Sequence, residues 1–227
     1  VVLSRGLGDV YKRQKLNYEN LVDGNFDFMG GNLVILREEF SDERAWEALG
    51  SGKVLICMGG ADPKSYTKKI LENIILNHKR CSSPQDEIEI NVIVGSACTD
   101  YDDLKSLAVT DKLKVSILFN PENISQLMLQ SELCILSCGT MILEACALGV
   151  PSIGIAVAEN QKSTAEFLAS SGAIEFYDFN NEKDLSIYRV ILDFINNPKK
   201  LSLCSKKLKT MVSSDATEII ARRLCES

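Results

Sequence analysis

LCILSCGTMILEACALGVPSIGIAV (residues 133–157) contains two short apolar runs separated by a helical stretch. The runs LCILS (133–137) and PSIGIAV (151–157) have the length of strands, and continuous apolar character is typical of strands that are buried on both faces. A strand, a helix and a second strand in this order predict a right-handed βαβ unit of a parallel sheet.

The same alternation continues toward both ends of the chain. Apolar runs predict further strands at 33–36, 54–58, 87–95, 115–119 and, at an edge, 173–177. Amphipathic stretches predict helices at 62–77, 101–108, about 121–130 and 161–170, and three more that end near 196, 211 and 224. Asp62 and Pro63 are expected as the N-cap and first residue of the helix at 62–77. The sequence therefore predicts an α/β fold with a Rossmann-like, doubly wound parallel sheet.

The beginning of the chain differs from the rest. Residues 1–14 have no helical or strand period and resemble a translated sequencing adapter, so we treat them as non-native. Residues 15–31 are expected to be a linker or remnant of a preceding domain. The Rossmann-like domain with its C-terminal helices is then predicted to span 32–227.

Composition narrows the classes of function. A net charge of −6 disfavours a nucleic-acid partner, and no run approaches the roughly 18 apolar residues of a membrane span. The eight cysteines include no C-x-x-C pair, which indicates reduced thiols in a cytoplasmic protein. With a single histidine, His78, the sequence predicts neither a metal site nor a bound cofactor.

Two glycine-bearing turns follow predicted strands, Gly59-Gly60 and Ser137 to Thr140 with Gly139 between them. In a parallel sheet, ligands lie beyond the carboxyl ends of the strands, and free amides at a helix start attract anions. Glycine also allows a phosphate to approach the backbone closely. Neither turn matches the dinucleotide or P-loop pattern, and each is also explained by a tight turn alone.

Polar residues near these turns are candidates for contacts with a sugar. Glu144 lies one helical turn after Thr140 in an apolar stretch, where it is either paired with a cation, exposed to solvent, or an acceptor for ribose hydroxyls. Asn160 and Gln161 follow the strand at 151–157 and place donors and acceptors at the same edge. Cys138 has no neighbouring base in the sequence, which favours a structural role.

Two segments resemble a known family. VLICMGGADP (54–63) and SCGTMILEACALGVPSIGIAVAENQ (137–161) resemble the UDP-sugar hydrolases of pseudaminic acid biosynthesis, and VILREEF (34–40) is similar to that family's link between domains. The resemblance extends to the N-acetylglucosaminyltransferase that completes lipid II and to spore-coat polysaccharide proteins. It implies that the chain is the C-terminal half of a GT-B fold, with an N-terminal domain of the same enzyme as its partner.

The resemblance also implies roles for matching residues. Gly59, Gly60, Ser137, Gly139 and Thr140 would line the diphosphate of a UDP-sugar, and Glu144 would hold the ribose. The turn from Asn120 to Ile124 would read uracil, while Asn160 and Gln161 would face the sugar or the attacking water. The implied reaction releases UDP from UDP-2,4-diacetamido-2,4,6-trideoxy-β-L-altropyranose.

One feature of the family is missing from this sequence. The catalytic histidine of the hydrolases belongs to a G-x-G-H loop, which no segment here matches, and His78 should not inherit that role. We therefore expect the parent enzyme to be catalytic and this chain alone to be inactive. The alternatives are the donor-binding domain of a UDP-sugar-dependent glycosyltransferase and a non-catalytic nucleotide-sugar-binding module.

Overall fold

The computed structural model describes residues 34, 36–40, 45–80, 88–110, 113–178 and 187–212. Its six strands are β1 (Lys53–Cys57), β2 (Glu89–Val94), β3 (Lys114–Phe119), β4 (Leu133–Ser137), β5 (Ser152–Ile155) and β6 (Glu175–Tyr177). The helices are the 3₁₀ turn η2 (Glu38–Phe40), α2 (Tyr66–Arg80), α3 (Tyr101–Ala108), α4 (Ile124–Leu129), α5 (Thr140–Leu148), α6 (Glu159–Ser170), α7 (Ile187–Ile195) and α8 (Pro198–Leu208). No helix within these ranges is long and apolar enough to cross a bilayer.

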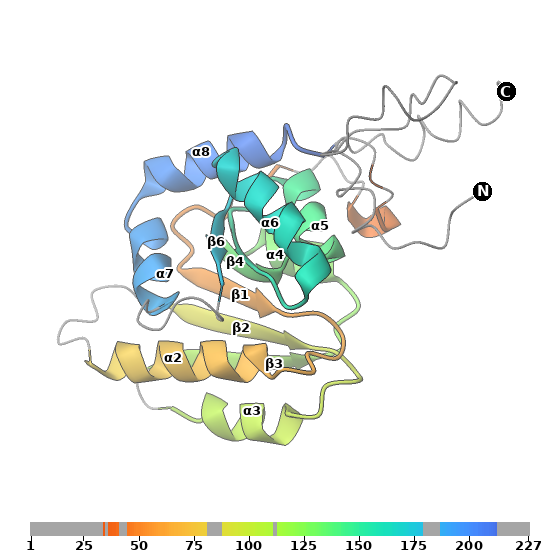
Figure 1. The fold of residues 1–227 in the computed structure, drawn as a ribbon. Coiled ribbons are helices and arrows are strands. Elements are labelled where there is room, and N and C mark those ends of the chain that lie inside the picture. The colour runs from red at the N-terminus through yellow and green to blue at the C-terminus, as the bar shows by residue number, and fades with distance from the viewer. Residues whose placement is uncertain are drawn as a thin grey trace, which may run out of the picture.

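The six strands form one sheet in the order β3-β2-β1-β4-β5-β6, and all neighbouring pairs are parallel (Figure 1). The chain runs outward from β1 to β3 and then returns to the centre to form β4 beside β1. This reversal gives the sheet a topological switch point between β1 and β4. The predicted α/β, Rossmann-like, doubly wound sheet is confirmed.

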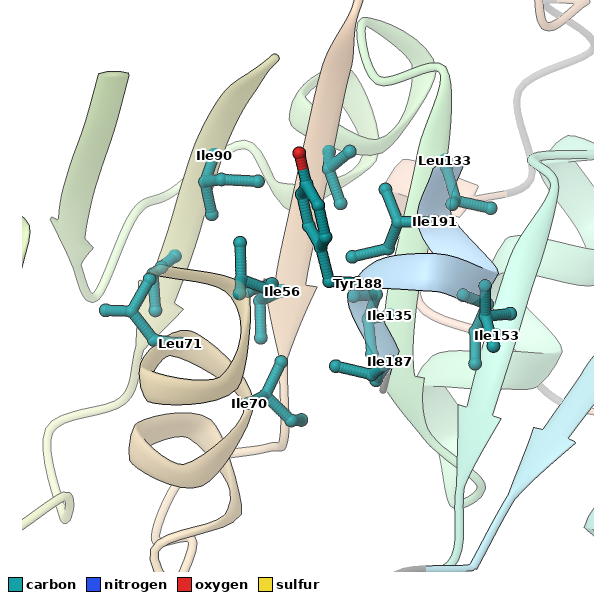
Figure 2. Packing of buried hydrophobic residues seen from close by; sticks show 14 of the residues in the cluster. Ile56, Ile70, Leu71, Ile90, Leu133, Ile135, Ile153, Ile187, Tyr188 and Ile191 are labelled. Atoms are coloured by element: carbon teal, nitrogen blue, oxygen red, sulfur yellow. The ribbon is translucent and has the colours of Figure 1, made fainter. Parts of the chain in front are cut away.

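Apolar side chains alternate between the two faces of the sheet. In β1, Val54 and Ile56 belong to one buried cluster with α2 and α7, whereas Leu55 and Cys57 belong to a second cluster with α4 and α5. Figure 2 shows the first cluster, in which side chains from α2 and α7 meet those of four strands: Ile70 and Leu71, Ile187, Tyr188 and Ile191, and Ile56, Ile90, Leu133, Ile135 and Ile153. Burial on both faces explains why these strands are continuously apolar in sequence.

The order of the elements in residues 133–157 is as predicted. α5 ends at Gly149, whose φ of 67° lies in the left-handed region where glycine is favoured at a helix end. The amide of Val150 donates to the Ala145 carbonyl, which closes the helix before Pro151. The chain can therefore enter β5 within a few residues.

Two local predictions are wrong. α2 begins at Tyr66 rather than at 62, because residues 63–64 form a turn and Asp62 caps the helix from further upstream. Val34 and Leu36 do not belong to a strand, although Val34 is buried against the cluster around α5. Residues 1–33, and the helical stretch predicted to end near 224, lie outside the described residues.

Glu132 joins the amino ends of β1 and β4. Its carboxylate accepts from the amides of Gly50 and Gly52, each at 2.8 Å, while its own amide donates to the Lys53 carbonyl at 2.8 Å. The residue is only 2% exposed. A buried carboxylate that satisfies two backbone donors is expensive to remove, because both amides would lose their acceptor.

We expect Glu132→Ala to lower the free energy of unfolding by about 1–3 kcal/mol, the usual cost of stranding buried polar groups. Urea denaturation followed by circular dichroism measures this change. Glu122→Ala is the matched control, because Glu122 is exposed. Equal midpoints for the two variants would contradict the role given to Glu132.

Candidate functional site

The two glycine turns predicted as a ligand site follow the two strands that flank the switch point. β1 and β4 are paired with Cys57 opposite Leu136, so Gly59 and Ser137 leave the sheet side by side. The Ser137 hydroxyl lies 4.0 Å from the position that a Cβ on Gly59 would occupy. The structure thus brings both turns to the edge where open α/β sheets bind ligands.

The helices that follow these turns differ at their amino ends. In α2, the Asp62 carboxylate accepts from the amides of Tyr66 at 2.9 Å and Thr67 at 2.7 Å. In α5, Gly139 occupies the N-cap and no side chain caps the helix. Thr140, the first residue of α5, is exposed. The first amides of α5 are therefore available to an anion, whereas those of α2 already donate to the Asp62 carboxylate.

Gln161 extends the site at α5. Its Oε1 accepts from the Val157 amide at 3.1 Å, which fixes the side-chain amide across the end of β5. Its Nε2 lies 3.3 Å from where a Cβ on Gly139 would stand, so the amide nitrogen is directed toward the α5 turn. Asn160 lies in the first turn of α6 and is exposed.

Gly95 packs against the first glycine turn, although sequence reasoning treated it only as the end of a strand. A Cβ on Gly95 would stand 2.5 Å from the Gly60 Cα and 2.8 Å from its carbonyl carbon. The turn after β1 therefore rests directly on the turn after β2. The signal in the sequence was a glycine that directly follows an apolar strand.

Glu144 is buried and paired with a cation. It is 3% exposed, and its carboxylate accepts from Arg37 Nε at 2.8 Å and Arg37 Nη2 at 3.0 Å. The hydrogen bonds to Glu144 raise the pKa of the Arg37 guanidinium above its ordinary value. Of the three environments considered for Glu144, the structure shows the ion pair.

Arg37 makes further contacts within its own segment. Its Nη1 lies 2.8 Å from Glu39 Oε1, and its guanidinium carbon lies 4.6 Å from the centre of the Phe40 ring. Glu39 Oε2 in turn accepts from the amide of Ser125 at 3.1 Å, next to Ile124 at the start of α4. Sequence reasoning used this segment only as a link between domains and missed both charged residues.

The turn proposed to lie near a base is placed at the carboxyl end of β3. Asn120 has a φ of 44°, and its amide donates to the Val94 carbonyl at 2.8 Å. Ile124 is half-buried at the start of α4, which packs against α5. The turn is thus connected to α5 through α4.

Cys138 and His78 occupy structural positions. The Cys138 sulfur lies 2.6 Å from where a Cβ on Gly154 would stand, and burial raises the pKa of this thiol to about 12. His78 lies in the last turn of α2, far along the helix from the site, and its Nδ1 is 2.8 Å from the Tyr188 hydroxyl. A buried neutral thiol is a poor nucleophile, and a buried histidine at the opposite end of α2 cannot reach the two glycine turns.

Comparison with known proteins places the fold. The family model described as the glycosyltransferase family 28 C-terminal domain matches residues 54–220. MurG of Acinetobacter baumannii superimposes with a TM-score of 0.62 at 18% identity, over 84% of this chain and 52% of that one. The sheet therefore corresponds to one half of a GT-B glycosyltransferase fold, as the sequence predicted.

Two curated relatives each align with about two thirds of the chain. An uncharacterized protein of Methanocaldococcus jannaschii is 31% identical over 67% of this chain and 31% of its own length. The UDP-2,4-diacetamido-2,4,6-trideoxy-β-L-altropyranose hydrolase of Campylobacter jejuni is 28% identical over 69% of this chain and 53% of its own length. The chain thus spans about a third to a half of the length of these relatives.

The contact between Gly95 and Gly60 leads to a prediction. Gly95→Ala should lower the free energy of unfolding by about 1–3 kcal/mol, because the added methyl group overpacks against backbone that cannot move freely. Gly60→Ala is the control, since a Cβ there meets nothing within 4 Å. Urea denaturation of both variants should separate them, and equal stability would mean that the two turns do not touch.

Proposed function

The chain belongs to the glycosyltransferase family 28 C-terminal domain family. We propose that the edge of its sheet at the two glycine turns binds the nucleotide part of a UDP-sugar. The observation that carries the proposal is the uncapped amino end of α5, which opens beside the β1 turn at the switch point. The helix amides attract the diphosphate there, and the adjacent glycines let it approach the backbone.

The remaining contacts are proposed from the family resemblance of these segments. Ser137, Gly139 and Thr140 line the diphosphate together with Gly59 and Gly60 on the neighbouring turn. Glu144, one turn further along α5, accepts from the ribose hydroxyls.

In a UDP-sugar, the uracil base and the sugar carried by the diphosphate lie at opposite ends of the molecule. The turn from Asn120 to Ile124 contacts uracil. Asn160 and the Gln161 amide face the sugar or the attacking water.

For the whole enzyme, the proposed reaction is hydrolysis of UDP-2,4-diacetamido-2,4,6-trideoxy-β-L-altropyranose with release of UDP. The support is the 28% identity to the Campylobacter jejuni enzyme together with the motif at 137–161. The six cysteines within the described ranges are free thiols, which fits the proposed cytoplasmic location. A glycosyltransferase that uses the same nucleotide site is the second candidate, supported by the family match and the similarity of fold to MurG.

Calorimetric titration with UDP tests the nucleotide site. We expect binding, and we expect Thr140→Val to weaken it by about 0.5–1.5 kcal/mol, or roughly two- to tenfold, through loss of one hydroxyl. Thr210→Val is the matched control, because Thr210 lies away from the proposed diphosphate contacts. Its neighbour Lys209 packs on Gly149, at the opposite end of α5 from Thr140. A folded chain that binds no UDP, or a Thr140→Val variant that binds like Thr210→Val, would contradict this assignment.

A competition experiment separates the two candidate reactions. If the enzyme is the hydrolase, UDP-2,4-diacetamido-2,4,6-trideoxy-β-L-altropyranose should displace UDP at lower concentration than UDP-N-acetylglucosamine does. The nucleotide sugar should remain intact on this chain alone, because its single histidine is buried against Tyr188. A preference for UDP-N-acetylglucosamine favours the transferase, and release of UDP would show that the chain supplies its own acid–base group.

A further inference from the structure

The ion pair between Arg37 and Glu144 has a geometry that a ligand site requires. A carboxylate has about four lone-pair positions, and the two-pronged contact with Arg37 uses one on each oxygen. The remaining position on each oxygen points outward, away from the guanidinium, and can accept from one hydroxyl group. The rigid guanidinium fork also fixes the plane in which these positions lie, which a lysine ammonium cannot do.

Arg37 is itself held in place from several directions. Phe40 is fully buried beneath the guanidinium, and Val34 is buried in the same cluster. Glu39 binds the third nitrogen of Arg37 and, through its other oxygen, the amide of Ser125. Residues 36–40 thus connect α5, which carries Glu144, with α4, which begins at Ile124.

We infer that Arg37 is a positioning residue of the nucleotide site, which orients Glu144 toward the ribose hydroxyls and fixes it relative to the base-contacting turn. This inference rests on the proposed binding of UDP. Arg37 acts through Glu144 and does not itself touch the nucleotide in this arrangement. The Arg37 side chain is 48% accessible to solvent. The ion pair therefore forms without full desolvation of the cation.

The role of Arg37 predicts which part of the ligand each variant affects. The wild-type chain should bind UDP more tightly than 2′-deoxy-UDP, because the deoxy analogue leaves one position on Glu144 unpaired. In Arg37→Lys, UDP affinity should fall about tenfold and the preference over 2′-deoxy-UDP should fall to about twofold or less, since a point charge cannot hold the carboxylate plane. Affinity for inorganic pyrophosphate, which reaches only the α5 turn, should stay unchanged.

Calorimetry with UDP, 2′-deoxy-UDP and inorganic pyrophosphate makes these comparisons on the full chain. Arg80→Lys is the matched control, because Arg80 is exposed at the carboxyl end of α2. Equal losses for all three ligands in Arg37→Lys would indicate a general structural defect and overturn the inference. An unchanged preference for UDP would overturn it as well. If the wild-type chain binds no UDP, the proposed function fails instead.

Glu39→Gln provides a second, milder variant in case Arg37→Lys does not fold. The glutamine keeps an acceptor for the Ser125 amide and removes only the charge that faces Arg37. We expect UDP affinity to fall about threefold, with a smaller preference over 2′-deoxy-UDP and unchanged pyrophosphate binding. A Glu39→Gln variant with the full wild-type preference would overturn the link between Glu39, Arg37 and Glu144.

Discussion

The register between β1 and β4 is the constraint on which the arrangement of the two glycine turns depends. Both strands are apolar on both faces, so inward and outward alternation does not select one register over its neighbours. Glu132 supplies a polar constraint at the opposite edge of the sheet, where its carboxylate holds the two amides that precede β1. Because a strand is stiff along its length, fixing the start of β1 against β4 also fixes where Gly59 meets Ser137. A structural carboxylate at one edge thus helps to determine how the two glycine turns of the candidate site lie at the other.

The two helices at the switch point differ in whether their first amides are available to an anion. The Asp62 carboxylate occupies the amides at the start of α2 and adds negative charge there, so a phosphate is disfavoured at that helix. Gly139 leaves the start of α5 without a side-chain acceptor. Of two similar glycine turns, only the second keeps its helix amides available. At the turn after β1, Gly59 and Gly60 carry no side chains, which leaves room for a ligand beside the backbone.

The sequence was sufficient for features that depend on local pattern. Residues 133–157 alone specify a strand, a helix and a parallel strand, and the carboxyl ends of such strands meet at one edge whatever the rest of the chain does. The position of the α2 start was not predictable in the same way. An aspartate and a proline predict a cap but not how many residues the cap spans, and Asp62 reaches both the fourth and fifth residues beyond it.

Contacts between distant residues were outside the reach of local pattern. Glu144 and Arg37 are separated by 107 positions, so the sequence could say only that a carboxylate in an apolar helix needs a partner. The contact of Gly95 with Gly60 likewise depends on two neighbouring strands ending at the same height. These tertiary contacts complete a site whose individual turns were visible in the sequence.

The pairing of Glu144 is difficult to explain by stability alone. It replaces what would be a fully apolar face of α5 with a buried charge, and apolar side chains of similar volume are often equally or more stabilising in such positions. Its partner comes from a segment outside the sheet whose aromatic and aliphatic side chains are themselves buried to hold it. A carboxylate with a fixed plane, one helical turn from uncapped amides, suits a ligand that presents a hydroxyl group beside a phosphate. The proposed recognition of such a ligand would account for the desolvation cost of Glu144.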